Sequence, residues 1–189
     1  MSALIFIAVI LLSLITICSA AVAVLYISYF ISVLLEWIYK RIRSNQKMRH
    51  IIIFHESFIA RWFLPKSYSA IMLFGMVFTR YSKLDDVAIN HEWWHTRQYM
   101  DIFSVCLMLT ILAATIAGIC DFYPLWWAVG GLFLSAIAYY IWYVVEYLVN
   151  LIKLKNHDDA YYAIRFERQA YALENDFISE YKHFSWIKF

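Results

Sequence analysis

The sequence predicts a mainly α-helical membrane protein with about three transmembrane helices. Of its 189 residues, 63% are hydrophobic and 20% are aromatic, which is more apolar than an ordinary soluble domain. No charged residue occurs from Ala3 to Leu35, and two further apolar runs cover Ile102–Cys120 and Leu125 to about Leu151. Each run approaches or exceeds the roughly 20 residues that a helix needs to cross a bilayer.

The first element is the N-terminal apolar run, which we expect to form a transmembrane anchor over residues 1–39. A cleavable signal peptide would start with a basic segment, but no Lys or Arg precedes Lys40. The run is long enough for one tilted helix or for two segments that meet near Ser19-Ala20, and the sequence favours neither arrangement.

The other two apolar runs are separated only by the short turn at residues 121–124, so residues 102–151 are expected to form a transmembrane hairpin. Every Lys and Arg lies either at 40–97 or after residue 152. The positive-inside rule therefore places residues 40–101 and the tail 152–189 in the cytoplasm. Anionic lipid head groups explain the basic residues, since a net charge of +2 is too small to indicate nucleic acid.

Two elements are predicted between the anchor and the hairpin. Ile71–Thr79 is short, apolar and rich in β-forming residues, which favours a strand, although a re-entrant or interfacial helix fits equally well. Asp85 or Asp86 then caps the helix that follows. Trp93 and Trp94 in that helix are expected at the bilayer interface, where tryptophan is enriched.

The same helix contains the sequence His91-Glu92-Trp93-Trp94-His95, which has the pattern H-E-x-x-H. Residues four apart share one face of a helix, so His91 and His95 can bind the same metal ion. Glu92 lies beside them, where it can accept a proton from an attacking water. The pattern indicates a hydrolytic zinc site, and the alternative is a helix that only happens to carry two surface histidines.

A zinc site with two histidines needs a third ligand, and the tail offers a carboxylate on the same side of the membrane. Asp158 or Asp159 can cap a helix there. One face of this helix carries four residues at spacings i, i+3, i+4 and i+7, namely Glu167, Ala170, Tyr171 and Glu174. Small Ala170 would permit a close approach of this face to the histidine helix. The alternative is an amphipathic tail that lies on the membrane surface.

Together the two motifs resemble those of the gluzincin metallopeptidases, in which a Glu on a second helix completes the metal site. The resemblance is carried by His91-Glu92-x-x-His95 and by Glu167-x-x-Ala170. Membrane-embedded gluzincins such as the CaaX-processing and heat-shock membrane proteases share this pair of motifs, with a helical hairpin between them. The resemblance implies a Zn2+ cofactor held by the two histidines and Glu167, with Glu92 as the catalytic base.

Residues 89–98 and 166–171 also resemble a group of small bacterial membrane proteins, which implies a location in the inner (cytoplasmic) membrane. Many gluzincins have an Asp four residues after the ligand Glu, where it holds a ligand histidine. This chain has Tyr171 at that position. Either Tyr171 or Glu174, one turn further on, is therefore expected to hold a ligand histidine by a hydrogen bond.

Other residues near the motifs are candidates with open roles. Gln98 lies at i+3 from His95 and either borders the site or faces the surface. Tyr161, Tyr162 and Arg165 are alternatives for the group that stabilises the oxyanion of a tetrahedral intermediate.

The sequence thus predicts a zinc metalloendopeptidase that cleaves protein or peptide substrates at the cytoplasmic face of a membrane. A di-iron oxygenase would need paired E-x-x-H motifs, and Glu92-x-x-His95 supplies only one. The stronger rival is a non-catalytic scaffold or regulatory subunit that retains a zinc site. Glu92 separates the two, because hydrolysis needs a base inside the histidine pair and a structural site does not. The substrate and the oligomeric state do not follow from the sequence.

Overall fold

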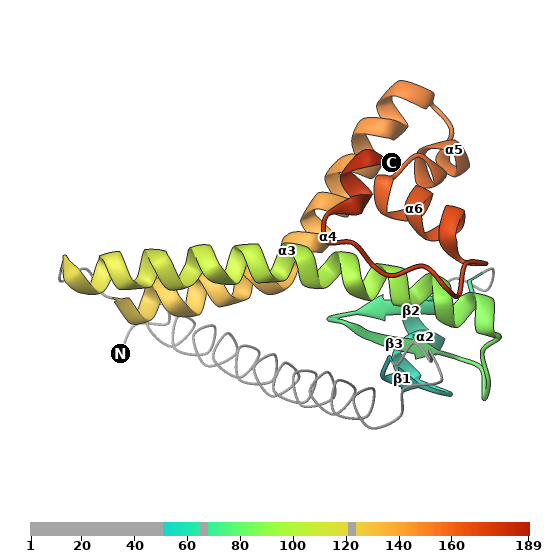
Figure 1. Cartoon of the computed structure of the whole chain (residues 1–189), viewed down its shortest axis with the longest axis horizontal. Coiled ribbons are helices and arrows are strands. Elements are labelled where there is room, and N and C mark those ends of the chain that lie inside the picture. Colours follow the sequence, from blue (N-terminus) through green and yellow to red (C-terminus); the bar gives the residue numbers. More distant parts are fainter. Residues whose placement is uncertain (1–50, 65–67, 121–123) are drawn as a thin grey trace, which may run out of the picture. The chain divides into compact units, whose positions relative to one another are not determined.

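The computed structural model describes residues 51–64, 68–120 and 124–189, so the predicted anchor at 1–39 lies outside the described residues. Figure 1 shows the elements in chain order: β1 (Ile53–Phe54), α2 (Phe58–Phe63), β2 (Ala70–Leu73), β3 (Met76–Thr79), α3 (Asp86–Ile119), α4 (Pro124–Leu154), α5 (His157–Tyr162), α6 (Arg165–Leu173) and the 3-10 helix η1 (Ser185–Lys188). Two compact units divide the described chain. One contains Val105–Ala136, and the other contains residues 51–104 and 137–189.

Helices α3 and α4 are long and apolar enough to cross a membrane. The predicted hairpin therefore appears as two candidate membrane-spanning helices, while the count of three spans stays a prediction. Helix α3 extends further than expected, because the histidine motif and the apolar run that begins at Ile102 form one continuous helix of 34 residues. The continuity has a simple cause, since no Gly or Pro interrupts the sequence from Asp86 to Ala117.

In the first unit, the second part of α3 packs against the first part of α4 through small and hydroxyl-bearing residues. The hydroxyl oxygens of Thr110 and Ser135 lie 3.2 Å apart across the two helices. A Cβ atom at Gly131 would come within 2.4 Å of the Thr110 side chain, whereas one at Gly130 would meet no atom within 4 Å. The absence of a side chain at Gly131 thus allows the close approach of the two helices.

The second unit contains a three-stranded sheet in the order β1-β3-β2. β3 pairs in parallel with β1 and antiparallel with β2, where Leu73 pairs with Met76. Phe74 and Gly75 form the two-residue turn with φ of 53° and 78°, as a type I′ hairpin requires. The β-structure predicted over Ile71–Thr79 is therefore confirmed, and this left-handed turn divides the segment into two strands.

The tail forms two helices, whereas one was expected. Asn156 caps α5, since its Oδ1 accepts hydrogen bonds from the backbone amides of Asp158 and Asp159, so the predicted caps at Asp158 or Asp159 are wrong. Helix α6 begins at Arg165, whose backbone N and Nε both donate to Glu146 Oε1, at 3.3 and 2.8 Å. Glu146 of α4 thus satisfies an amide at the start of α6 that would otherwise lack an acceptor.

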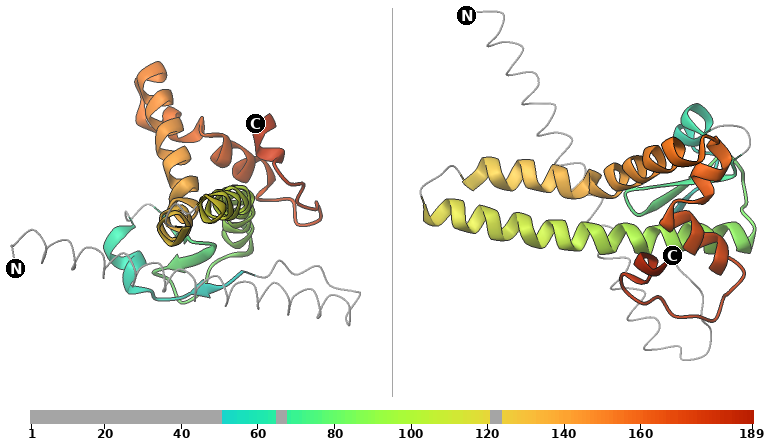
Figure 2. Two further views of the ribbon diagram at one scale, coloured as in Figure 1. Left: turned by 90° about the vertical axis from the view of Figure 1, so that its left-hand side faces the viewer. Right: turned by 90° about the horizontal axis from the view of Figure 1, so that it is seen from above.

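Within the second unit, the sheet and α6 lie on opposite sides of the first part of α3 (Figures 1 and 2). Trp93 and Trp94 of α3 are buried and pack against Ala170 of α6 and Tyr181. The predicted place of these tryptophans at the bilayer interface is wrong. They form the core between α3 and α6, since an indole ring suits a protein interior as well as a membrane interface.

We predict that Gly131→Ala lowers the thermal unfolding midpoint of the detergent-solubilised protein, because the added methyl group would overlap Thr110. Overpacking of this kind typically costs about 1–3 kcal/mol. Gly130→Ala is the matched control and should leave the midpoint unchanged or raise it, because its methyl group enters open space and favours the helix. Equal midpoints for the two variants would contradict the proposed helix contact.

Candidate metal centre

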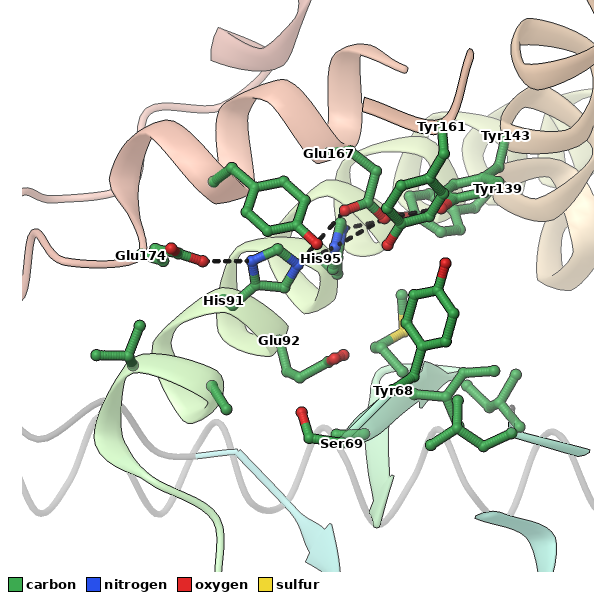
Figure 3. A pocket seen from close by; sticks show the side chains of 18 of the residues that line it. Tyr68, Ser69, His91, Glu92, His95, Tyr139, Tyr143, Tyr161, Glu167 and Glu174 are labelled. Atoms are coloured by element: carbon green, nitrogen blue, oxygen red, sulfur yellow. Dashed lines mark hydrogen bonds and ion pairs between the residues drawn. The ribbon is translucent and has the colours of Figure 1, made fainter. Parts of the chain in front are cut away.

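His91, His95 and Glu167 form a group that could hold a metal ion, and their ligand atoms all lie within 4.8 Å of one another. The two Nε2 atoms are 3.1 Å apart. Glu167 Oε2 lies 3.4 Å from His91 Nε2, and Glu167 Oε1 lies 3.3 Å from His95 Nε2. Figure 3 shows the three side chains converging from two helices. The three residues that the sequence proposed as ligands are thus brought together.

The fold places these ligands by two local features. His91 and His95 are one turn apart on α3, which begins where Asp85 Oδ1 accepts a hydrogen bond from Ala88 N at 2.7 Å, so the predicted cap is confirmed. Glu167 lies in the first turn of α6, and Ala170 on the same face is fully buried against the α3 tryptophans. The small Ala170 side chain allows α6 to approach α3 closely, as expected.

The geometry and chemistry of the group fit a divalent cation. Ligands at 2.0–2.1 Å from a tetrahedral zinc would lie about 3.3 Å apart, close to the observed separations. Glu167 Oε2 is buried and has no hydrogen-bond partner among the described residues. Burial alone would raise the pKa of the Glu167 carboxyl, but the neighbouring His95 and His91 imidazoles outweigh burial and lower the pKa. Glu167 is therefore a carboxylate with one oxygen available to a cation.

His91 is oriented by a carboxylate. Its Nδ1 lies 3.0 Å from Glu174 Oε2, while the ring of Tyr171 packs edge-on at 4.5 Å between centroids. Of the two partners that the sequence left open, Glu174 takes the hydrogen bond and Tyr171 supplies a ring contact. A hydrogen bond at Nδ1 fixes the tautomer of His91 and leaves the Nε2 lone pair directed at the group of ligands.

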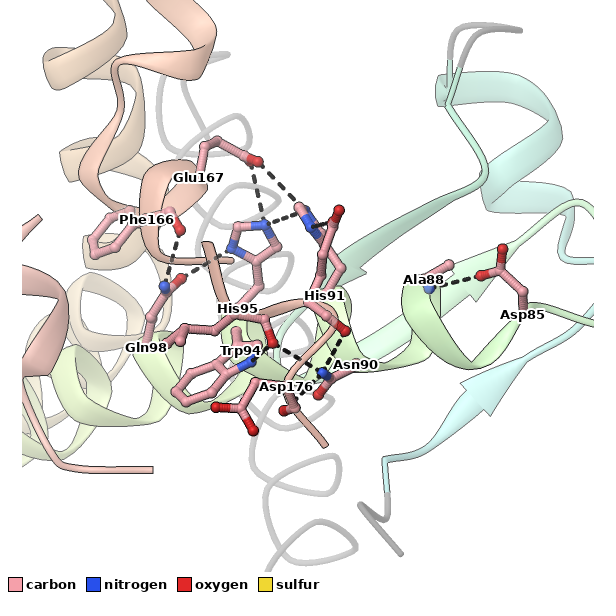
Figure 4. Close-up of polar contacts among 12 residues, drawn as sticks. Asp85, Ala88, Asn90, His91, Trp94, His95, Gln98, Phe166, Glu167 and Asp176 are labelled. Atoms are coloured by element: carbon pink, nitrogen blue, oxygen red, sulfur yellow. Dashed lines mark hydrogen bonds and ion pairs between the residues drawn. The ribbon is translucent and has the colours of Figure 1, made fainter. Parts of the chain in front are cut away.

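His95 is oriented by an amide (Figure 4). Gln98 Oε1 lies 2.9 Å from His95 Nδ1, and Gln98 Nε2 donates to Phe166 O and Gln169 Oε1, each at 3.0 Å. Because both amide hydrogens of Gln98 have acceptors, its oxygen faces the imidazole and Nδ1–H donates to it. Gln98 is fully buried, so it borders the site and does not face the surface.

Glu92 lies next to the ligands without joining them. Its side chain is buried and lines a cavity of about 460 Å3 whose other walls come from β2, α4, α5 and α6. In Figure 3 it extends into the space between α3 and the chain around Ser69, just before β2. A carboxylate in this place can accept a proton from a molecule in the cavity.

Tyrosines form much of the cavity wall, and most were missed in the sequence. The residues concerned are Tyr68, Tyr139, Tyr140, Tyr143, Tyr161 and Tyr171. Tyr143 Oη donates to Glu167 Oε1 at 2.7 Å, and Tyr139 Oη lies 3.2 Å from His95 Nδ1. Tyr139 and Tyr143 are four residues apart within an apolar run, and this polar stripe on one helix face is the signal that could have identified them.

Of the three candidates for oxyanion stabilisation, only Tyr161 lines the cavity. Its pKa is raised, first by burial and then by the negative charge of the adjacent Glu167 carboxylate. Tyr162 is half-exposed and contacts the rings of Tyr161 and Tyr171. Arg165 is bound to Glu146 by its Nε at 2.8 Å, so it does not reach the site.

Comparisons with protein-family models, with characterised proteins and with solved structures found no match. The resemblance to gluzincins therefore depends on the two sequence motifs, and the candidate metal centre depends on the convergence of His91, His95 and Glu167.

We predict that replacing His91, His95 or Glu167 with Ala removes most of the metal from the purified protein, measured by inductively coupled plasma mass spectrometry. Glu174→Ala should retain a metal site but weaken its affinity by about 10–100-fold, because it orients a ligand and does not itself bind. Retention of metal in Glu167→Ala, with complete loss in Glu174→Ala, would show that the wrong carboxylate has been assigned.

Proposed function

We propose that this protein is a membrane-bound zinc metalloendopeptidase that hydrolyses peptide bonds of membrane-associated proteins or peptides at the cytoplasmic face of the bacterial inner membrane. The observation that carries the proposal is the position of Glu92, which lines the same cavity as the group formed by His91, His95 and Glu167. The cavity thus combines a possible metal site with a buried carboxylate that is not one of its ligands.

Zinc is the metal that this ligand set supports best. Two imidazole nitrogens and one carboxylate make three protein ligands, the number that is typical of catalytic zinc sites with a position left open. Zinc bound by these residues would supply Lewis acidity for the substrate carbonyl and for the attacking water. Glu174 and Gln98 would keep the two imidazoles in the ligating tautomer throughout.

Glu92 is proposed as the general base. It would accept a proton from the attacking water and then donate that proton to the departing amine, so that each turnover restores the carboxylate. A site that served only to stabilise the fold would gain nothing from a second buried carboxylate beside Glu167. This argument favours hydrolysis over the scaffold role.

Strand β2 offers a surface for an extended peptide. It lies at the edge of the sheet, and Ala70–Leu73 line the cavity. Val77 N donates to Ile52 O, on the β1 side of β3. Met72 and Val77 are therefore a non-hydrogen-bonded pair of the antiparallel ladder between β2 and β3. The main-chain groups of Met72 consequently point away from β3. A substrate strand could pair with this edge without regard to its sequence.

Tyr68 is proposed as the group that stabilises the oxyanion. It precedes β2 and extends into the cavity toward Glu167 (Figure 3), and the ring of Tyr161 contacts it at 5.8 Å between centroids. Its hydroxyl makes no hydrogen bond to another described residue, and Glu167 already accepts a hydrogen bond from Tyr143 at 2.7 Å. A free phenol donor is suited to the negative charge that develops on the carbonyl oxygen.

The link between site and membrane supports the substrate class. His91 and His95 lie on the same helix as the apolar run that begins at Ile102. The basic residues after α4, Lys153 and Lys155, favour the cytoplasmic side for α5 and α6. A site held this close to a bilayer would act on polypeptide segments at or near the membrane surface.

We predict that Glu92→Gln abolishes peptide hydrolysis while zinc content and thermal stability stay at the wild-type level. Gln has nearly the same volume and removes no ligand, but it cannot accept the proton, so turnover should fall by about 10²–10⁴-fold. The measurement compares cleavage of a quenched-fluorescent peptide library by purified wild-type and variant protein. The membrane proteomes of cells that carry each form should identify the natural substrate, which accumulates only with the variant.

Glu56→Gln is the matched control for Glu92→Gln and should cleave like wild type, because Glu56 is exposed and does not line the cavity. If Glu92→Gln matches wild type in every assay in which deletion of the protein has an effect, the scaffold role replaces the enzyme role.

We also predict that Tyr68→Phe lowers kcat by about 10²-fold and leaves KM and zinc content unchanged, because the lost donor acts mainly in the transition state. Tyr81→Phe is the matched control, since Tyr81 is exposed and does not line the cavity. An unchanged kcat in Tyr68→Phe, with a reduced kcat in Tyr161→Phe, would assign the role to Tyr161.

A further inference from the structure

The chain continues after α6 into a C-terminal strap, residues 176–189, that returns to the side of α3 next to α6 (Figure 1). We infer that this strap is a working part of the metal centre, because it holds the side chains that orient His95 and support Glu167. Docking of the strap and binding of the metal then reinforce each other. The inference rests on the metal site of the proposed function but not on hydrolysis.

A chain of buried hydrogen bonds links the strap to the histidine. Ser185 Oγ accepts from Gln169 Nε2 at 2.7 Å, and Gln169 Oε1 accepts from Gln98 Nε2 at 3.0 Å. Gln98 Oε1 then lies 2.9 Å from His95 Nδ1. Both glutamines are fully buried, so neither can replace a lost partner with bulk water. The strap therefore fixes Gln169, which in turn fixes the amide that orients His95.

Asp101 of α3 fastens the strap at a second place. Its carboxylate is buried and accepts from Tyr181 Oη and from Phe184 N, each at 2.6 Å, and its Oδ1 lies 2.6 Å from His183 Nδ1. All three of these partners belong to the strap. Release of the strap would leave a buried carboxylate without them, which makes the docked position strongly favoured.

Aromatic ring contacts also link the strap to α6, the helix that carries Glu167. Trp186 of η1 is buried and packs on Phe166 at 4.9 Å between ring centroids, and on Trp142 of α4 at 5.5 Å. Phe166 immediately precedes Glu167, and its carbonyl also accepts from Gln98. The strap thus supports the first turn of α6, where the carboxylate ligand is placed.

The consequence is a reciprocal coupling. If the docked strap raises metal affinity by some factor, bound metal must stabilise the docked strap by the same factor. A protease or a binding partner that removes the strap from α3 would then lower metal affinity without touching a ligand. Gln98, Gln169 and Asp101 are positioning residues in this scheme, and none of them lines the cavity beside the metal site.

The first test measures Zn2+ affinity of full-length protein in detergent by competition with a chromogenic chelator. Gln169→Met keeps the length of the side chain and removes its hydrogen bonds, and Asp101→Asn weakens the second anchor. Each should reduce affinity by about 10-fold or more and alter the visible absorption spectrum of the Co2+-substituted protein. Asp158→Asn, an exposed position on α5, is the matched control and should match wild type.

The second test begins with wild-type protein with and without Zn2+, so its main comparison does not depend on a variant that folds. A carboxypeptidase should trim residues 181–189 more slowly with saturating Zn2+ than after chelation, and Gln169→Met should lose this difference. Wild-type Zn2+ affinity in both variants would overturn the inference, and so would an equal rate of trimming with Zn2+ and after chelation. Coupled zinc binding without any peptide hydrolysis would refute the proposed function and leave this inference intact.

Discussion

The structure depends on one electrostatic constraint, the packing of the partly buried His91 imidazole and the buried His95 imidazole against the buried Glu167 carboxylate, with their ligand atoms 3.1–3.4 Å apart. Such groups interact strongly in an interior from which water is excluded, and they are costly to bury without a partner. A bound cation would satisfy all three at once. The hydrogen bonds around the site are therefore best understood as the means of holding His91, His95 and Glu167 in the one arrangement in which their burial is favourable.

Most of the hydrogen bonds that position the three ligands join α3 to α6. Asn90, Trp94 and Gln98 follow one another at four-residue intervals on α3, and each donates a hydrogen bond to a backbone carbonyl at one end of α6. Helix α6 has only nine residues, which is too short for a stable isolated helix. Its position is thus set by contacts with α3, with Glu146 of α4 and with the C-terminal strap. The helix that carries the third ligand has no defined place without them.

The sequence by itself determined what depends on local periodicity. The spacing of His91 and His95 places both on one face of a helix, whatever the rest of the chain does. Helical periodicity also places Glu167 and Ala170 on one face. Local residue preferences limited the cap of α3 to Asp85 or Asp86, of which the structure uses Asp85, and composition marked the two apolar runs as helices long enough to cross a membrane. These features are fixed within a few turns of helix, so they can be predicted from the order of the residues.

The tertiary structure decided which distant groups meet. Whether Tyr171 or Glu174 holds His91, and whether Gln98 faces the site, depended on the angle at which α6 crosses α3. The break before Arg165 depended on Glu146, a residue 19 positions earlier on another helix. Trp93 and Trp94 could equally have faced lipid or protein, and contacts with α6 and the strap placed them in the core. A side chain with two suitable environments takes the one that packing supplies, and packing between distant segments is not a local property of the sequence.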